Sequence, residues 1–495
     1  MTSDELVGWS AGELGAAIAR LDVSCVEVMR AHLDHIEATN PTYNAIVSLR
    51  PRDELIAQAR ACDDELRHGG VGWLHGVPYA AKDLEDVAGL PTTWGLMRPE
   101  EVGAAERDSL PVARVRAAGA ILIGKTNTPE LGLGSHTFNE VFGVTRNPWN
   151  PAWSAGGSSG GAAAAVALRM LAVADGSDFF GSLRNPAGWC QVYGLRPTPG
   201  VVPSGEGNPF EQAGGVVGPM ARTATDLARL LATLAGPHAA EPWSWPRGAA
   251  SGRPDSSTAL ETGRAPRRVG WLGDLGGYLP TQDGLLDAVR HGLSPLDRLG
   301  ATLEPATLDG DGGDGFVSAR DLWPTWLTFR HWQVGTGLLP LYDDPDLRRR
   351  LKPEAVFEVE GLLGLPAGQP IGAREVAECT ARRTALLTRF RALFAQFDLL
   401  IAPTSQVYPF PADQRWPLRI GGVEMSSYHR WMEVTAPATL VGLPVLGLPL
   451  GLDRAGRPIG AQVIAAHHRE DLLLRFASDW ERVVGPPLAP AAAAT

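Results

Sequence analysis

The chain has 495 residues, of which 44% are hydrophobic and 20% are charged, and these fractions are typical of a large globular protein. The formal net charge of -11 at pH 7 is spread without a long acidic or basic run, which argues against nucleic acid as the main partner. The four cysteines are widely separated and form no Cys-x-x-Cys pair, so neither a disulfide framework nor a zinc site is predicted.

The N-terminal segment lacks the basic start and apolar core of a secretory signal peptide. The chain also contains no uninterrupted run of about 18 apolar residues, which is the length that a membrane-spanning helix needs. We therefore expect a cytoplasmic protein that does not act at a membrane.

The first half of the chain begins with two or three predicted amphipathic helices between residues 10 and 70, one of which has Pro41 as a stop. Between 71 and 200, short apolar runs such as GAILIG alternate with helical segments, which is the pattern of an α/β sheet covered by helices. A further amphipathic helix is predicted over 221–236, with Thr225 as its N-terminal cap.

The second half begins with a proline- and glycine-rich stretch over 237–268, which predicts a long surface loop. A strand is predicted within 268–275, a helix over 283–299 and a long helix over 373–396. Three tryptophans precede the long helix, and we expect them to pack in the core rather than contact a substrate: Trp323, Trp326 and Trp332.

Two serines, Ser158 and Ser182, lie in glycine-flanked turns on either side of a short helix-forming segment, AAAAVALRML. Glycine permits positive φ and a close approach of the backbone to a ligand. The first turn, GGSSGG, opens that helix, and the free N–H groups of a helix N-terminus suit an oxyanion or a carbonyl. The pattern therefore favours a catalytic site over a flexible linker.

These segments resemble the amidase signature family of Ser-Ser-Lys hydrolases. The family's two serine motifs are similar to GGSSGG at 156–161 and to GSDFFGSLRNPAGWCQVYGLRPTPGVVP at 176–203. Its lysine segment is similar to HGVPYAAKDLEDVAGLPTTWG from His75, its joining segment to GAILIGKTNTPELGLGSHTFNEVFGVTRNPWNP, and its closing strands to DLLIAPT and VTAPATLVGLPVLGLPLGLDRAGRPIGAQVI. The resemblance covers nearly the whole chain except about 236–395.

The resemblance implies an α/β fold in which a large mixed, twisted β-sheet core is covered on both faces by α-helices. It implies one amidase domain over 1–495 and no metal or organic cofactor. Within that domain we expect four parts: N-terminal helices over 1–70, the catalytic core over 71–235, a variable wall or lid of the substrate pocket over 236–397, and C-terminal core strands with a helix over 398–495.

By this resemblance Ser182 is the nucleophile, Ser158 relays its proton to neutral Lys82, and the Gly157-Ser158 peptide is cis. A serine hydroxyl is a weak nucleophile until a base takes its proton, and no histidine lies near either serine motif. Lys82 follows the apolar run VPYAA, and burial there would lower its pKa toward the range in which it can act as a base.

The resemblance also implies that backbone N–H groups before the nucleophile form the oxyanion hole, and that nearby residues support the site. The implied donors are Phe179, Phe180, Gly181 and Ser182, and the supporting residues are Ser159, Gly157, Asp178 and Arg184. The family usually has glycine two residues before the nucleophile, where this chain has phenylalanine. Either the loop adopts another conformation, or its dihedral angles never required glycine. The two rings could line an apolar or aryl-accepting pocket or pack in the core.

Three other motifs suggest different functions. GAILIGKT, 119–126, fits the phosphate-binding pattern GxxxxGKT, but its middle residues form strands rather than loops. GSSGG, 157–161, fits a nucleophile elbow centred on Ser159, although NPWNPAWSA is a poor strand to precede one. DGDGGDG, 309–315, is similar to a calcium loop but has Arg320 where a glutamate ligand belongs, so a plain turn is predicted.

The combined prediction is an amidohydrolase that cleaves the carbonyl C–N bond of a small, apolar or aryl amide through an acyl-enzyme on Ser182. The same residues could serve a carbamate hydrolase (a urethanase) or an esterase, since each substrate passes through a tetrahedral oxyanion. A glutaminase subunit of a tRNA amidotransferase shares the signature, and a non-catalytic binding protein stays open if the phenylalanines have altered the loop. A homodimer is also left open.

Overall fold

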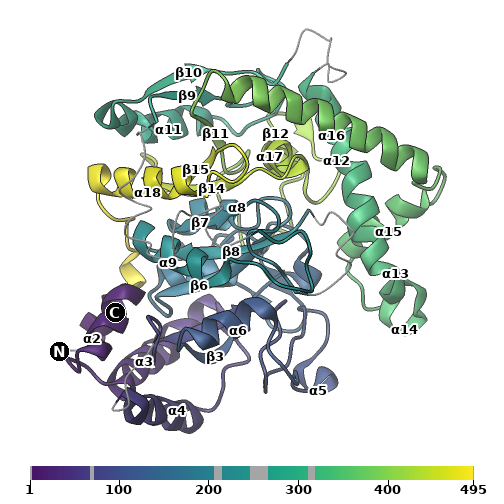
Figure 1. The fold of residues 1–495 in the computed structure, drawn as a ribbon. Helices are drawn as coiled ribbons and strands as arrows, with labels where there is room; N and C mark the ends of the chain where they lie inside the picture. Colours follow the sequence, from purple (N-terminus) through teal and green to yellow (C-terminus); the bar gives the residue numbers. More distant parts are fainter. Residues whose placement is uncertain (1–2, 67–71, 206–213, 246–265, 310–317, 494–495) are drawn as a thin grey trace.

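The computed structural model describes residues 3–66, 72–205, 214–245, 266–309 and 318–493 (Figure 1). Its centre is a mixed eight-stranded sheet flanked by helices, which confirms the predicted α/β fold. The strands, in sheet order, are β10 (Thr302–Pro305), β9 (Arg268–Trp271), β11 (Leu399–Pro403), β15 (Pro458–Ile464), β14 (Val445–Leu452), β7 (Tyr193–Arg196), β8 (Val216–Ala221) and β6 (Val173–Asp178).

The strand order brings the C-terminal part of the chain into the middle of the sheet. β14 pairs antiparallel with β7, and β15 joins β14 to β11, also antiparallel. β9 lies parallel to both β10 and β11. β6, which leads directly into the loop of Ser182, is the last strand at the opposite end from β10 and pairs antiparallel with β8.

Helices cover the central strands of the sheet, so that these strands are buried on both faces. β11 and β15 are buried along their whole length. α8 (Arg184–Cys190) packs on β14 and β15, and α7 (Gly160–Ala167) packs on α8 and β6. α9 (Ala224–Leu234) packs on β8 and against α18 (Glu470–Val484).

A second, three-stranded sheet has the order β1-β3-β2, formed by β1 (Ile46–Val47), β2 (Pro78–Lys82) and β3 (Ile121–Thr126). β2 is buried throughout, packs beside β6 and ends at Lys82. GAILIGKT forms β3, and its Lys125 is buried and ion-paired with Asp83 at 3.4 Å. A phosphate-cradling loop is therefore not present at this motif, because the segment is an interior strand.

The N-terminal helices are α1 (Ser3–Gly8), α2 (Ala11–Ala19), α3 (Cys25–Tyr43) and α4 (Arg52–Glu65). The prediction that Pro41 stops its helix is wrong, because α3 runs on to Tyr43. Proline lacks only its own N–H, and the last turn closes when Asn44, at a φ of 50°, donates its N–H to the carbonyl of Asn40.

The cap of α9 also differs from its prediction. The N-cap is Thr223, whose hydroxyl accepts a hydrogen bond from the N–H of Asp226 at 3.1 Å, and Thr225 already lies inside the helix. A cap side chain must reach the N–H two or three residues further on, and Thr223 is the threonine placed to do so.

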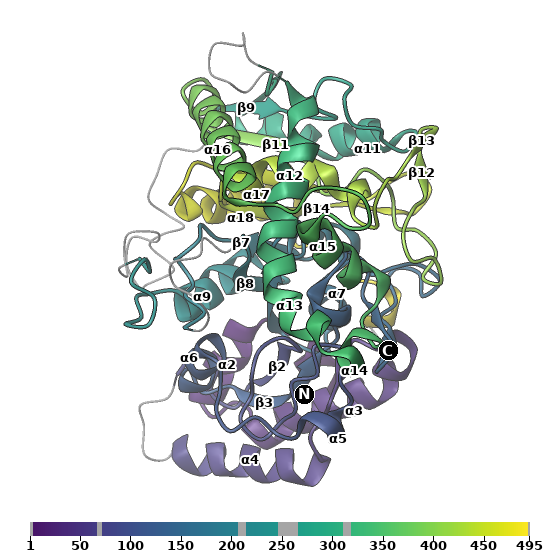
Figure 2. The same ribbon diagram turned by 90° about the vertical axis from the view of Figure 1, so that its right-hand side faces the viewer.

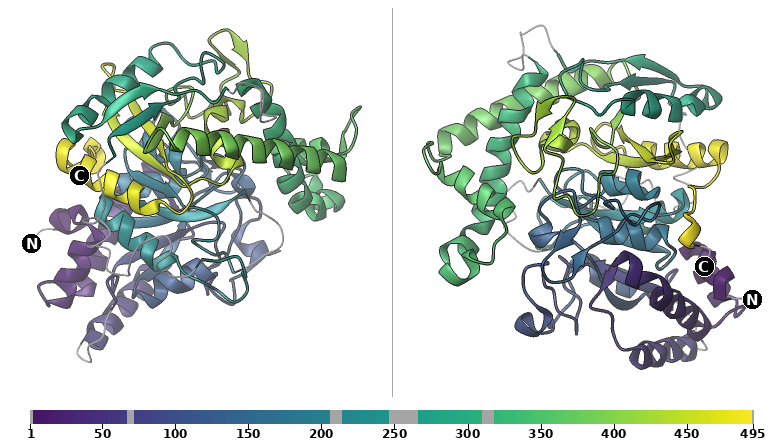
Figure 3. Two further views of the ribbon diagram at one scale, coloured as in Figure 1. Left: turned by 45° about the horizontal axis from the view of Figure 1, so that its top comes forward. Right: turned by 180° about the vertical axis from the view of Figure 1, so that it is seen from behind.

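The described residues of the second half of the chain contribute seven helices before the C-terminal α18. They are α11 (Leu285–Gly292), α12 (Leu322–Arg330), α13 (Thr336–Asp343), α14 (Pro345–Arg348), α15 (Pro353–Leu363), α16 (Ala373–Phe394) and α17 (Ala436–Leu440). Figure 2 shows α12 and α13 as one column that runs from the level of β9 down to that of β2. α16 packs against α12 and crosses the same side of the molecule (Figure 3), as predicted for 373–396.

The helix predicted over 283–299 is broken. α11 ends at Gly292 and a 3₁₀ segment, Ser294–Leu299, follows, because Pro295 lacks an N–H and disfavours helical geometry in the residue before it. The predicted loop at 237–268 and the motif at 309–315 lie largely outside the described residues. The remaining short elements are α5 (Pro99–Val102), α6 (Leu110–Ala117), β4 (Phe138–Asn139) with β5 (Gly143–Val144), and β12 (Arg419–Ile420) with β13 (Val423–Glu424).

Within the described ranges, no helix combines the length and the hydropathy needed to cross a bilayer. Trp323 and Trp326 are buried in one apolar cluster with Phe180, and Trp332 packs against that cluster, so the tryptophans belong to the core as predicted.

Candidate active site

Lys82 stands at the end of β2 with its amine surrounded by hydroxyl groups. Its Nζ lies 2.7 Å from Ser158 Oγ, 3.0 Å from Ser159 Oγ and 2.9 Å from Ser177 Oγ. A neutral amine has two N–H donors and one lone pair, so it can donate to two of these hydroxyls and accept from the third. The amine is therefore fully hydrogen-bonded without carrying a charge.

Burial lowers the pKa of Lys82 to about 7, although Asp175, Asp178 and Glu85 act in the opposite direction. The Lys82 side chain is almost fully enclosed, and removal from water disfavours the charged form. Asp175 fixes the strand beneath the amine, because its carboxylate accepts hydrogen bonds from Tyr79 Oη at 2.8 Å and from the Lys82 N–H at 3.2 Å. A substantial fraction of Lys82 is thus neutral near pH 7.

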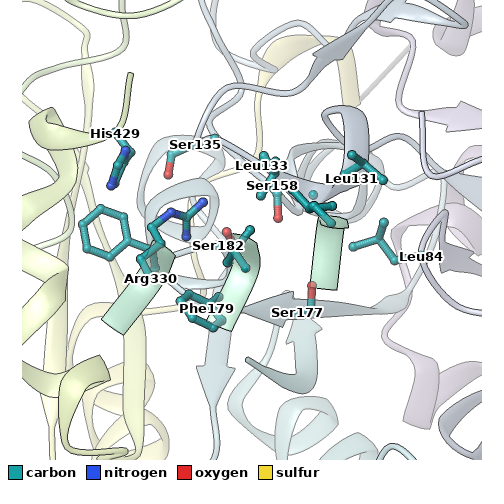
Figure 4. A pocket seen from close by; sticks show the side chains of 15 residues that line it. Leu84, Leu131, Leu133, Ser135, Ser158, Ser177, Phe179, Ser182, Arg330 and His429 are labelled. Atoms are coloured by element: carbon teal, nitrogen blue, oxygen red, sulfur yellow. The ribbon is translucent and has the colours of Figure 1, made fainter. Parts of the chain in front are cut away.

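The two serine turns are joined through their backbones. The Gly157-Ser158 peptide is cis, as the resemblance implied. The N–H of Ser159 donates to the carbonyl of Ser182 at 3.2 Å, and Ser159 Oγ accepts from the N–H of Ser177 at the same distance. Ser158 and Ser182 both border one cavity, together with Ser177 from the end of β6 (Figure 4).

Asp178 organises the loop that precedes Ser182. Its buried carboxylate accepts from the N–H of Gly181 at 2.9 Å and of Leu183 at 3.1 Å, and it pairs with the guanidinium of Arg184 through two hydrogen bonds of 2.9 Å each. Burial alone would raise the pKa of Asp178, but Arg184 and Arg196 outweigh it and hold that pKa below its ordinary value. The carboxylate therefore remains charged and keeps the loop folded around it.

Arg184 also ties this loop to distant parts of the chain. Its Nη1 donates to the Thr435 carbonyl at 3.1 Å and to Gln462 Oε1 at 2.8 Å, and its Nη2 donates to Thr439 Oγ1 at 2.8 Å. Gln462 lies in β15, in the middle of the main sheet. The Asp178–Arg184 pair is internal rather than a solvated surface pair, because both side chains have an exposed fraction of 0%.

The loop that leads to Ser182 borders the cavity and contains backbone N–H groups that are free to donate. Within the described residues, the N–H groups of Phe179, Phe180 and Ser182 make no hydrogen bond, whereas that of Gly181 donates to Asp178. Gly181 has a φ of 85°, which favours glycine at this position. An added Cβ there would also come within 2.8 Å of Met432 Cε.

Phe179 and Phe180 do not require glycine, since neither has a positive φ. The ring of Phe180 stacks on Trp326 with centroids 4.0 Å apart, and Phe179 stacks on Phe329 at 5.7 Å. Both residues border the cavity as well. The departure from the family's glycine is thus accommodated by backbone angles open to any residue and by an aromatic cluster supplied by α12.

The cavity has a volume of about 200 Å³. Its walls are mostly apolar. The polar side chains that line it are those of the serines and of Arg330 and His429 (Figure 4). The lining residues are Leu84, Leu131, Gly132, Leu133, Gly134, Ser135, Ser158, Ser177, Phe179, Phe180, Ser182, Arg330, Val334, Leu338 and His429.

Sequence reasoning missed several of these residues. Ser177 stands inside the second serine motif, one residue before Asp178, yet no role was predicted for it. The sequence does contain a signal for Arg330, because it lies four residues after Trp326 and therefore shares the buried face of α12. A charged residue on a core face indicates a buried ion pair. His429 lies outside every motif, and the sequence offers no comparable signal for it.

An amine and serine hydroxyls that meet at a buried cavity, beside a loop of free backbone donors, are the groups that an acyl-transferring hydrolase uses. Comparison with known proteins gives the same class. The family model described as Amidase matches residues 27–310 and 368–474, and the chain belongs to the amidase signature family. It is therefore a hydrolase that acts on carbon–nitrogen bonds.

The similarity to individual relatives extends over almost the whole chain. The sequence is 34% identical to an acylamidase of Rhodococcus erythropolis, with 98% of this chain and 97% of that protein covered. It is 32% identical to one subunit of the glutamyl-tRNA(Gln) amidotransferase of Thermosynechococcus vestitus, with 95% and 97% covered. The solved structure of a bacterial aryl acylamidase of the amidase signature enzymes matches with a TM-score of 0.86 and 27% identity over 98% of each chain.

Proposed function

We propose that the protein hydrolyses small, apolar or aryl amides through an acyl-enzyme on Ser182. The observation that carries this proposal is the amine of Lys82, which has a pKa of about 7 and lies 2.7 Å from Ser158 Oγ at the border of the same cavity as Ser182. A base whose pKa lies near the working pH is the kind that general-base catalysis favours.

The proposed reaction has two halves. In the first, Ser182 Oγ attacks the amide carbonyl while its proton passes to Ser158 and from Ser158 to Lys82; the proton then returns to the leaving amine. In the second, water attacks the acyl-enzyme while its proton passes through Ser158 to Lys82. The bond between the acyl carbon and Ser182 Oγ then breaks, the acid is released, and the proton returns through Ser158 to Ser182 Oγ. The free N–H groups of Phe179, Phe180 and Ser182 would donate to the oxyanion in both tetrahedral intermediates, while Gly181 stays bonded to Asp178.

The cavity supports a substrate with one ring or a short apolar chain. An apolar cavity of about 150 Å³ holds a benzene molecule, so about 200 Å³ leaves room for one ring and a few further atoms. Val334, Leu338 and Arg330 belong to the predicted variable region 236–397, which supports the proposal that this region forms the pocket wall. Carbamates and esters with groups of this size remain substrates of the same proposed mechanism.

The glutaminase alternative draws support from the amidotransferase subunits among the relatives. Against it stands the lining of the cavity, where leucine and phenylalanine side chains outnumber polar ones away from the serines. Burial of the charged amino and carboxylate groups of glutamine beside these side chains would be costly.

The experiment that tests the proposal measures intact protein mass after treatment with a serine-directed fluorophosphonate, and the rate of aniline release from acetanilide and 4-nitroacetanilide. Wild type should gain one adduct and hydrolyse an anilide. Ser182→Ala should lose both properties. Lys82→Ala should reduce turnover by about 10²- to 10⁴-fold, the usual contribution of a general base.

Ser159→Ala is the matched control, because this serine is the next residue along the same turn. It should retain the adduct, since its proposed part is to support Lys82. An adduct that survives in Ser182→Ala but disappears in Ser159→Ala would overturn the proposal in favour of the nucleophile elbow. Hydrolysis of carbamates or esters with no activity on any anilide would shift the substrate class and leave the mechanism standing.

A further inference from the structure

A buried charged network forms the wall of the cavity contributed by α12, α15 and the segment that precedes α17. Arg330 Nε donates to Glu358 Oε1 at 2.6 Å, and Arg330 Nη2 donates to Tyr428 Oη at 2.6 Å. Tyr428 Oη donates in turn to Glu358 Oε1 at 2.6 Å, and His331 Nδ1 lies 3.0 Å from Glu358 Oε2. In this network Arg330 lines the cavity, while Glu358 has an exposed fraction of 0%.

Arg330 keeps hydrogen-bonding capacity that the described residues do not use. A guanidinium has five N–H bonds, and the interactions just given occupy one on Nε and one on Nη2. Nη1 makes no hydrogen bond to any described residue. Because Arg330 borders the cavity, its remaining donors are available to a group that enters there (Figure 4).

The position of the guanidinium is fixed by aromatic rings. Its central carbon lies 5.5 Å from the ring centroid of Phe179, 5.7 Å from that of Trp326 and 5.8 Å from that of Tyr428. Contacts of this kind hold a cation over the ring faces. A ligand that accepts from Arg330 would therefore lose little free energy in ordering a mobile side chain.

The charge of Arg330 is already compensated. Burial would lower the pKa of Arg330, but Glu358 and Tyr428 outweigh it and keep the guanidinium charged. Burial likewise would raise the pKa of Glu358, but Arg330 holds it below its ordinary value. His429, which lines the cavity beside Arg330, is neutral because burial and the charge of Arg330 lower its pKa well below the ordinary value. The wall therefore offers hydrogen-bond donors without a net positive charge.

We propose that Arg330 binds a neutral oxygen acceptor, an ether or a carbonyl oxygen, on the part of the substrate that occupies the cavity. The proposal rests on the proposed function, since it takes the scissile amide to lie at Ser182. It narrows the substrate class to uncharged amides of about one ring that carry such an oxygen. A carboxylate is disfavoured, because it would have to share Arg330 with Glu358 and would bring an unpaired negative charge into a largely apolar cavity.

The test uses pairs of anilides that differ by one oxygen in place of a methylene group. One pair is methoxyacetanilide and butyranilide, and the other is 4-methoxyacetanilide and 4-ethylacetanilide. Affinities are measured by titration calorimetry with Ser182→Ala as the binding-competent background, so that the result does not depend on turnover. In at least one pair the oxygen compound should bind about ten-fold more tightly or better, the order expected for a hydrogen bond from a charged donor.

Arg330→Met in that background should reduce the ratio within the discriminating pair to about one. The matched control is Arg383→Met. The guanidinium of Arg383 also packs on an aromatic ring of α12, 4.2 Å from the Phe329 ring centroid, but Arg383 does not line the cavity. This control should keep the ratio. If Arg330→Met fails to fold because Glu358 is left unpaired, Arg330→Met with Glu358→Gln removes both charges and should give the same loss.

The outcomes separate this proposal from the proposed function. Equal affinities within both pairs, or a ratio that persists without Arg330, would overturn the role of Arg330. Tighter binding of 4-carboxyacetanilide than of 4-methoxyacetanilide would overturn the neutral-acceptor class and make the wall an anion site. Binding that follows the expected pattern while wild type hydrolyses none of the four anilides would support Arg330 and contradict the proposed reaction.

Discussion

Lys82 shows how far burial can lower the pKa of a lysine side chain. Its pKa falls from 10.5 to about 7 because the end of β2 is enclosed by α7 and β6, and the hydroxyls around it satisfy the neutral amine. Lys125, on the adjacent strand, is equally buried but pairs with Asp83, and burial lowers its pKa against the effect of that carboxylate. The difference between the two lysines is the partner of the amine: hydroxyls in one case, a carboxylate in the other.

This pKa sets the expected pH dependence. Below about 7 the amine of Lys82 carries a proton and cannot accept another, so kcat/KM for a neutral anilide should fall about ten-fold per pH unit as pH decreases. Above about 7 the amine is neutral and the rate should reach a plateau. Rates measured across this range, from mildly acidic to mildly alkaline buffer, check this expectation.

The control for that profile is Lys352→Arg. Burial lowers the pKa of Lys352 to about 8, and its Nζ donates to the Leu133 carbonyl in the cavity wall at 2.6 Å. Titration of this second lysine beside the cavity could therefore also make the rate fall at low pH. The midpoint should stay where the wild-type protein has it. If the fall in kcat/KM at low pH disappears in Lys352→Arg, or if the rate rises as pH falls, the proposed role of Lys82 is contradicted.

How far the sequence predicts the site depends on whether a residue lies in a contiguous motif. Lys82, Ser158 and Asp178 stand in long motifs whose order along the chain is specific, and the structure brings them together. Arg330 and His429 come from segments without a motif, and only folding places them at the cavity. Their position depends on how α12 packs on Phe179 and Phe180, which is a property of the tertiary structure.

At the scale of elements, α9 and α2 share a carboxylate. Asp226, in the first turn of α9, accepts from the N–H groups of Ala11 at 2.7 Å and Gly12 at 3.0 Å, which are otherwise unpaired at the start of α2. The same residue donates its own N–H to Thr223. Asp226 thus forms hydrogen bonds at the N-termini of both α9 and α2. The sequence around α9 could not reveal the contact with α2, because Ala11 is 215 positions away.

The cap assignment gives a prediction with a built-in control. Thr223→Ala should lower the free energy of unfolding by about 1 kcal/mol, because the N–H of Asp226 loses its acceptor. Thr225→Ala should change it much less, since Thr225 lies within the helix and serves no cap. Urea denaturation of the two variants measures the difference, and a larger loss in Thr225→Ala would show that the helix begins later than described.

At the scale of the whole molecule, the main sheet depends on β14 and β15, the two strands that are synthesised last. β14 and β15 join β7 to β11, so the sheet is two separate groups of three strands without them. The resemblance implied C-terminal core strands, but it did not predict which strands would be their neighbours. Pairing between segments so far apart in the chain is decided by packing of the whole sheet, whereas apolar runs predict only that a strand exists.

A chain that ends after residue 442 should therefore lack a cooperative unfolding transition and should not react with a fluorophosphonate. The loss has two causes: the sheet is divided, and Arg184 loses its hydrogen bond to Gln462. Calorimetry and intact mass check both properties. Co-expression of the separate segment 443–495 should restore labelling of Ser182, and a truncated chain that folds and reacts on its own would refute the expectation.

The hydrogen bond between Arg184 and Gln462 also has a meaning for protein synthesis. The two residues are 278 positions apart, and a ribosome that adds about 5–20 residues per second needs roughly 15–55 s to proceed from one to the other. During that interval Ser182 has been made, but the loop around it lacks its support from β15. We therefore expect Ser182 to become reactive only near the end of translation, because the strand that supports its loop is made late in synthesis.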